Sequence, residues 1–311
     1  MPSIQSVWYC IVNPHAGSGK TMPEWALAEK FLAARAVSYK TVLTHCKFHA
    51  TTLSYEAARE GFRRFLAVGG DGSVHEVLNG ILRYAVETGV PPEDFTLAVI
   101  PIGSGNDWIK SLNVPHDTRA VVDLLADGSF ARQDVVRVET GPDQVCYMAN
   151  IGGVGFDSRV CERVNALKER GKRSKLIYLG ALLQTLFTTR AFQTRIVADG
   201  EKVFEGEVYS VAFGNGRYSG GGMRQVPLSE IDDGLLDYMI VPKAPLLKLL
   251  TQLPRLYNGT ANESGLLISG RCRGLEMTGE NIVEIDGEVI GRLPLRLSMT
   301  GSQIRVPVGN L

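Results

Sequence analysis

Several features that mark other protein classes are scarce or missing in this 311-residue chain. The five cysteines form no C-x-x-C pair, which favours a reduced cytosolic compartment over a disulfide scaffold. The N-terminus has no basic segment followed by an apolar one, so no signal peptide is expected. The longest apolar stretch, 176–187, is shorter than the roughly 20 residues that a membrane-spanning helix needs. We therefore expect a cytoplasmic protein that is at most peripheral at the inner face of a membrane.

An excess of charge of either sign is also missing. The 33 lysines and arginines balance the 33 aspartates and glutamates, which argues against nucleic acid as a partner. The apolar content of 44% and the charged content of 21% are ordinary for a globular protein, and the length allows two domains. The composition thus leaves a globular protein with two cores as the expectation.

The first third of the chain repeats one pattern three times. Apolar, strand-like runs at 7–12, 62–68 and 95–100 are each followed by a glycine-rich loop, and helix-like segments lie between them. This alternation predicts a parallel sheet flanked by helices. Such sheets bind ligands at the carboxyl ends of their strands, where all three glycine loops fall.

From about residue 134 the pattern changes to short alternating runs, which predict a mainly antiparallel β-domain. The runs are 134–139, 145–151, 194–198, 203–209, 236–241, 275–278, 282–285 and 295–299. Asp-Gly pairs at 199–200, 233–234 and 286–287 favour tight hairpin turns. Helices are expected at 158–170, 175–190 and 245–257. The helical stretch 176–187 could meet a lipid tail or pack inside the protein, and both readings stay open.

The second glycine loop, Gly69-Gly70-Asp71-Gly72-Ser73, is the most informative. Ser73 and Glu76 have capping-box spacing, which predicts a helix that begins at Ser73. Its buried face would carry Val74, Val77, Leu78, Ile81, Leu82 and Ala85. A helix N-terminus attracts phosphate, and Asp71 could hold a metal ion or accept a proton from a hydroxyl group. A plain strand-to-helix turn with Asp71 as a cap is equally compatible with this segment.

The other two loops support a phosphate site. The segment 13–21 approaches a Walker A loop, but Pro14 stands where that motif needs glycine, so a standard P-loop is disfavoured. Gly17, Gly19 and Lys20 could still contact phosphates. Gly103-Ser104-Gly105-Asn106-Asp107 adds flexible backbone with donors and acceptors. Together the three loops predict a phosphate-binding edge more strongly than any one of them alone.

These motifs make the chain resemble the diacylglycerol kinase catalytic-domain family, which includes sphingosine and ceramide kinases and is distantly related to NAD kinases. The resemblance rests on Asn13-Pro14 with Gly17, on 69–73 with Glu76 and Asn79-Gly80, and on 103–107. It extends to Gly155-Phe156-Asp157, Asp233-Gly234-Leu235-Leu236-Asp237 and Asp286-Gly287-Glu288. It implies an NAD kinase-like α/β domain at 1–132, to which 300–311 returns, and a C-terminal β-sandwich domain at 133–299.

The resemblance also implies the site residues and partners. ATP would contact Asn13, Gly17, Lys20, Thr44, Gly69, Gly70, Asp71, Gly72, Ser73, Val74, His75, Ser104, Asn106 and Asp107. His75 departs from the asparagine of bacterial members, and Ser18 competes with Lys20 for the role of the loop lysine. A structural Mg²⁺ would bind the Asp233 side chain and the carbonyl groups of Glu230 and Leu235. A homodimer is left open.

The resulting hypothesis is Mg²⁺-dependent transfer of phosphate from ATP to a lipid hydroxyl, most simply that of diacylglycerol. Asp71 would organise the transfer, Glu288 would accept the proton, and Asp134 could support the pair. Transient contact with a membrane surface would follow from a lipid acceptor. A sphingoid-base or ceramide kinase is the main alternative. An NAD kinase and a non-catalytic nucleotide sensor are more remote ones.

Overall fold

The computed structural model describes residues 3–103, 105–141, 144–169, 185 and 188–309. Ser104 lies outside these residues, as does the apolar stretch 176–187 apart from Thr185. The chain separates into two compact units. The N-terminal unit comprises Met1–Val135 and Gly301–Leu311, and the C-terminal unit comprises Val136–Thr300.

The N-terminal unit is built on a parallel sheet, as the sequence predicts. Its strands are ordered β2 (Tyr39–Leu43), β1 (Trp8–Val12), β3 (Arg64–Gly69), β4 (Thr96–Pro101) and the end of β17 (Leu295–Pro307). Neighbouring strands are parallel throughout this order. β1, β3 and β4 are buried almost completely, which explains why each reads as a continuous apolar run.

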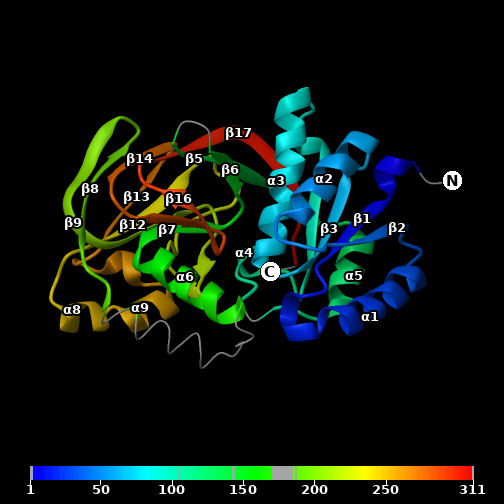
Figure 1. Ribbon diagram of the computed structural model, residues 1–311, viewed down its shortest axis with the longest axis horizontal. Helices are drawn as coiled ribbons and strands as arrows, with labels where there is room; N and C mark the ends of the chain where they lie inside the picture. The colour runs from blue at the N-terminus through cyan, green and yellow to red at the C-terminus, as the bar shows by residue number, and fades with distance from the viewer. Residues whose placement is uncertain (1–2, 104, 142–143, 170–184, 186–187, 310–311) are drawn as a thin grey trace. The chain divides into compact units, whose positions relative to one another are not determined.

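Two pairs of helices flank this sheet. Figure 1 shows α2 (His49–Glu60) with α3 (Asp71–Thr88) on one side of the strands and α1 (Thr21–Ala34) with α5 (Thr118–Asp127) on the other. The apolar face predicted for α3 is buried at every position, which confirms the helical period. The remaining short elements are η1 (Ile4–Ser6), η2 (Ala16–Gly19), η3 (Pro92–Asp94) and α4 (Trp108–Ser111).

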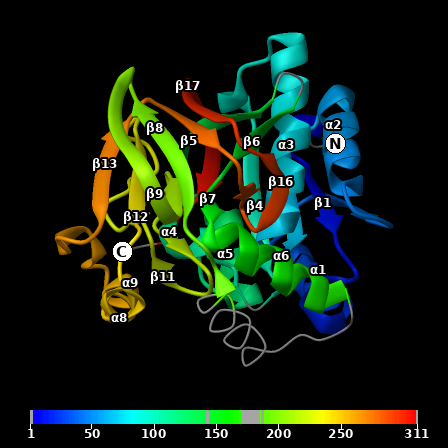
Figure 2. The same cartoon turned by 60° about the vertical axis from the view of Figure 1, so that its left-hand side comes forward.

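The C-terminal unit is an antiparallel β-sandwich, again as expected (Figure 2). Its main path runs β16 (Glu288–Arg292), β15 (Ile282–Ile285), β7 (Ile151–Gly155), β9 (Glu201–Gly214), β8 (Phe192–Ala198), β14 (Gly274–Gly279) and β17. β12 (Leu236–Pro242) joins β9 to β13 (Ile268–Cys272), and β5 (Phe130–Thr140) pairs with β6 (Val145–Met148). Inward-facing residues of these strands form an apolar core.

The described residues of the C-terminal unit also form smaller elements. They are α6 (Phe156–Glu169), β10 (Tyr218–Ser219), β11 (Met223–Arg224), α8 (Leu246–Leu250), α9 (Leu253–Asn258) and η4 (Ala261–Glu263). Within the described part of the chain, none of the helices has the length and apolar character to cross a bilayer.

Three local predictions for this unit were wrong. The run 145–151 is two strands, because the chain leaves the β6 ladder at Ala149 and Asn150 and bonds to Asp286 instead. The helix expected at 245–257 is two short helices, since Pro254 can only stand in the first turn of a helix and therefore starts α9 anew. Asp233-Gly234 joins no pair of hairpin strands and precedes β12 in an irregular segment.

The other two Asp-Gly pairs form the predicted tight turns. Asp199 and Gly200 have φ angles of 49° and 84° between β8 and β9, and Asp286 and Gly287 have 52° and 84° between β15 and β16. Two successive left-handed residues match the type I′ turn, which follows the twist of antiparallel strands. The hairpin that carries Glu288 is thereby confirmed.

Candidate active site

The three glycine loops lie together at the carboxyl ends of β1, β3 and β4. In the first loop, Asn13 accepts a hydrogen bond from the His15 amide at 3.0 Å, and its Nδ2 lies 3.5 Å from Ser73 Oγ of the second loop. Gly17 has φ +55°, and a Cβ there would stand 2.5 Å from Ile102 Cγ2, at the start of the third loop. The first loop therefore packs against both of the others.

Asp71 ties the second loop to the third. One of its carboxylate oxygens accepts the backbone N–H of Asp107 and the other that of Trp108, both at 3.2 Å. The Trp108 indole donates to Gln133 Oε1 at 2.9 Å in the interior, and Lys110 pairs with Asp107 at 2.5 Å. Backbone donors carry no sequence signal, so the sequence did not indicate this positioning role of Asp71.

The start of α3 differs from the prediction. The helix begins at Asp71 with Gly70 as its N-cap, so the capping box at Ser73 was wrong. The carboxylate of Glu76 accepts the amide of Ala50 at 3.1 Å and thereby serves the first turn of α2. Glu76 bonds to this distant partner because the first amides of α2 have no acceptor within their own helix and lie alongside α3. The N-terminal amides of α3 still begin beside the other two loops, as phosphate binding requires.

The remaining residues expected to bind ATP lie at or near this edge. Thr44 is buried and its amide donates to Val12 O at 2.9 Å, at the end of β1. Lys20 is exposed at the start of α1. Val74 and His75 are both buried, and the His75 ring lies 3.4 Å from the Asn79 amide nitrogen. The Val74 side chain is apolar, and its amide donates to Gly70 O at 3.2 Å.

Asn106 and Asp134 are held by contacts within the N-terminal unit. Asn106 adopts φ +49° and donates from its side chain to Gly103 O at 3.2 Å, which shapes the third loop. Asp134 accepts a hydrogen bond from the Gln303 side chain at 2.9 Å. That contact ties the last part of β17 to β5. It gives the buried Asp134 carboxylate a partner within the protein, so its burial needs no bound ligand to explain it.

In the C-terminal unit, hydrogen bonds around the turn of the β15–β16 hairpin hold the backbone at Glu288 in place. Asp286 accepts the amides of Ala149 and Asn150 at 3.0 and 2.9 Å, and Gly287 donates to Glu284 Oε2 at 3.1 Å. Glu288 opens β16 in register with Ile285 and is half-buried. A hairpin fixed on both sides of its turn holds the following side chain in a defined direction.

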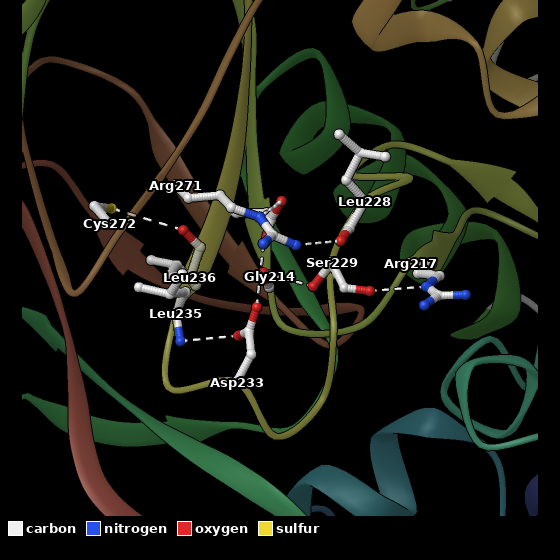
Figure 3. Close-up of polar contacts among 10 residues, drawn as sticks. Gly214, Arg217, Leu228, Ser229, Asp233, Leu235, Leu236, Arg271 and Cys272 are labelled. Carbon is white, nitrogen blue, oxygen red and sulfur yellow. Dashed lines mark hydrogen bonds and ion pairs between the residues drawn. The ribbon is translucent and has the colours of Figure 1, made fainter.

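In the segment expected to hold a structural Mg²⁺, Asp233 pairs with an arginine of β13. Asp233 Oδ1 accepts the Leu235 amide at 3.0 Å, and its Oδ2 lies 3.3 Å from Nη1 of Arg271 (Figure 3). Glu230 is exposed just before the turn. Among the described residues, no group of three or more His, Cys, Asp or Glu side chains is arranged to hold a metal ion.

Comparison with known families finds matches to two family models that together cover nearly the whole chain. Residues 7–138 match the diacylglycerol kinase catalytic domain, and residues 150–308 match the YegS C-terminal NAD kinase beta sandwich-like domain. The two matched regions contain the phosphate loops and the Glu288 hairpin, respectively.

Similar proteins are named as lipid kinases. A diacylglycerol kinase of Mycobacterium tuberculosis is 26% identical, with 95% of this chain and 93% of that protein covered. One of Bacillus subtilis is 29% identical over 91% and 90% of the two chains. A protein of Pseudomonas aeruginosa named "Probable lipid kinase YegS-like" is 30% identical over 82% and 80%.

Solved structures show the same fold at lower identity. A diacylglycerol kinase from Bacillus anthracis aligns with a TM-score of 0.74 at 21% identity, over 98% of this chain and 97% of that one. An NAD kinase from Archaeoglobus fulgidus in complex with ATP aligns with a TM-score of 0.52 at 13% identity, over 96% and 93%. With the family matches, these observations show that the chain belongs to the YegS-like, diacylglycerol kinase family of lipid kinases.

Proposed function

We propose that this protein transfers the γ-phosphoryl group of ATP to the hydroxyl of diacylglycerol and forms phosphatidic acid, a phospholipid precursor. The observation that carries the proposal is the set of three glycine loops that Asp71, Asn13 and Gly17 bring together at one sheet edge. Relatives named diacylglycerol kinase support the choice of acceptor. The reaction would take place on the cytoplasmic face of a membrane, which the protein would contact transiently.

The N-terminal unit would bind the nucleotide. Backbone amides at the start of α3 would face the phosphates, and the exposed Lys20 would offset their charge. The residues here also fit Mg²⁺, which prefers carboxylate oxygens as ligands. Each Asp71 oxygen accepts one backbone amide and keeps a second lone pair that could bind the ion. When bound with ATP, Mg²⁺ would neutralise charge on the transferred group.

The C-terminal unit would contribute the base. Glu288 would accept the proton of the acceptor hydroxyl as the oxygen attacks the γ-phosphorus, and ADP would leave. The Asp286 bonds to the Ala149 and Asn150 amides would keep the Glu288 carboxylate in position. Positioning of this kind is the main contribution that a protein makes to phosphoryl transfer.

The test is a radiolabelled-ATP assay over diacylglycerol, a sphingoid base, ceramide and NAD, with and without Mg²⁺. We expect label on diacylglycerol, and losses of at least about 100-fold for Asp71→Asn and Glu288→Gln, since base catalysis alone is worth about 10²–10⁴-fold. Glu201→Gln is the matched control, because Glu201 is exposed and opens β9 directly after the Asp199-Gly200 turn, as Glu288 opens β16 after Asp286-Gly287. Thermal unfolding checks that each variant folds.

Other outcomes would reassign the function. Label on a sphingoid base or ceramide would retain the lipid kinase and change its acceptor. Label on NAD alone would overturn the proposal, as would wild-type rates in both folded variants. Binding of ATP without turnover on any acceptor would make the protein a nucleotide sensor.

A further inference from the structure

Arg271 on β13 uses all three of its guanidinium nitrogens to bind the segment 228–237, which leads into β12 (Figure 3). Nε donates to Asp237 Oδ1 at 3.1 Å, and Nη1 lies 3.3 Å from Asp233 Oδ2. Nη2 donates to the backbone carbonyl of Leu228 at 2.5 Å. One side chain therefore joins two carboxylates and a carbonyl from three different points of the chain.

The strand register places this cation. Asp237 and Arg271 face each other directly in the antiparallel β12–β13 pair. The Asp237 side chain is only 8% exposed and that of Asp233 is 20% exposed, so the two negative charges are poorly solvated. Burial raises the pKa of Asp237, and the Arg271 guanidinium acts against this rise. Burial alone would lower the pKa of Arg271, but its bond to Asp237 and the nearby acidic charges raise it.

Two backbone carbonyls directly before Glu230, the first predicted metal ligand, are also taken by arginines. Leu228 O accepts from Arg271, and the next carbonyl, Ser229 O, accepts from Arg217 Nε at 2.7 Å. The buried Ser229 hydroxyl lies 3.3 Å from Gly214 O at the end of β9. Carboxylate and carbonyl oxygens are the ligands that Mg²⁺ prefers, and here guanidinium groups occupy several of them.

A structural Mg²⁺ at Asp233 fits this arrangement poorly. The ion needs octahedral oxygen ligands at about 2.0–2.1 Å and gives up its water reluctantly. One Asp233 oxygen accepts the Leu235 amide, as the Asp71 oxygens accept amides, but the other is paired with the Arg271 guanidinium, which brings a full positive charge that the amides at Asp71 do not. A guanidinium that cannot lose its proton would also repel a divalent ion beside it.

We infer that Arg271 takes the place of a structural divalent cation, so that the C-terminal unit of this protein folds and closes the 228–237 segment without one. The positive charge that neutralises Asp233 and Asp237 would come from the Arg271 side chain and not from a bound ion. Mg²⁺ would then be needed only where ATP binds and not to hold the C-terminal unit together. This inference does not depend on whether the acceptor is diacylglycerol.

The first experiment needs no variant. Nucleotide-free protein is treated with EDTA, and its thermal unfolding is followed by circular dichroism with 0, 1 and 10 mM Mg²⁺. We expect one melting temperature, within about 1 °C, in all three. Binding of Mn²⁺ is then measured by the loss of its free electron paramagnetic resonance signal. We expect wild type and Asp233→Asn to bind Mn²⁺ equally. Mg²⁺-dependent melting together with Mn²⁺ binding that Asp233→Asn abolishes would overturn the proposal.

The second experiment removes the internal cation. Arg271→Ala leaves Asp233 and Asp237 without their shared partner, and we expect melting to fall by on the order of 5 °C. Arg273→Ala is the matched control, because Arg273 is exposed two residues along and has no ion pair among the described residues. Equal stability of Arg271→Ala and Arg273→Ala would refute the assignment.

Discussion

Gly70 offers a way to separate nucleotide binding from folding. Its backbone is extended, with φ −104° and ψ −167°, a conformation open to any residue. Among the described residues, a Cβ at Gly70 would meet only Asn106 Oδ1 at 3.6 Å and Ile102 O at 3.9 Å, which are ordinary contacts. Folding therefore does not require glycine here, whereas close approach of a phosphate to the backbone does.

Gly70→Ala should leave stability intact and weaken ATP binding. Loss of chain entropy in the unfolded state favours alanine by about 0.4–1 kcal/mol, so melting should stay level or rise by a few degrees. Each charge-assisted hydrogen bond to a phosphate is worth about 1.5–3 kcal/mol, so losing one reduces ATP affinity about 10- to 100-fold. Calorimetric titration with ATP and Mg²⁺ measures the affinity, and circular dichroism measures the melting.

Gly89→Ala is the opposite control. Gly89 follows the end of α3 with φ +73°, and a Cβ there would have no atom of the described residues within 4 Å. Alanine at this position therefore introduces backbone strain without a clash. We expect it to destabilise the protein by about 1 kcal/mol and to bind ATP normally. If Gly70→Ala binds ATP as tightly as wild type, the α3 N-terminus does not receive the phosphates, and our site is wrong.

Three further predictions concern packing and ionisation. Gly80→Ala should lower stability by about 2 kcal/mol in thermal unfolding, because its Cβ would stand 2.2 Å from the Thr51 carbonyl oxygen and would push α2 from α3; an unchanged melting temperature would contradict the close approach of these helices. Burial, aided by the Asp286 charge, raises the pKa of Cys146 to about 12, so this thiol should resist a disulfide reagent at pH 8 while the exposed Cys46 reacts. Because unfolding would release the Cys146 proton above about pH 9, stability should fall with pH from there to about 12, and Cys146→Ala should flatten that slope.

The sequence predicted best where burial imposes a pattern. β1, β3 and β4 are covered on both faces, so their apolar runs lie within two residues of the observed strands. The face of α3 from Val74 to Ala85 was equally readable, because one side of the helix packs in the core. The turn at Asp286-Gly287 was predictable because few other residue pairs adopt two left-handed conformations.

Predictions failed where a distant partner overrides a local preference. The spacing of Ser73 and Glu76 suits a capping box, yet Glu76 bonds to Ala50, 26 residues away. The strand run 145–151 looks continuous, but Asp286 removes two of its amides from the ladder. Asp233 pairs with Arg271, which lies 38 residues later on β13, and no local sequence pattern predicts this pair. These contacts exist only once the chain has folded.

The aspartates of the glycine motifs share one structural task, and this affects how any loss of activity is read. Asp71 binds the amides of Asp107 and Trp108, Asp286 binds those of Ala149 and Asn150, and Asp199 binds those of Arg273 and Gly274. In each case a carboxylate beside a glycine fastens a distant stretch of backbone. Asp199 does so at a turn for which no chemical role is proposed, so this geometry alone is no sign of catalysis. An Asp71→Asn variant would misplace the third loop even if Asp71 never contacted nucleotide. Gly70 is therefore the more discriminating position, because a glycine has no side chain whose fastening role could be lost.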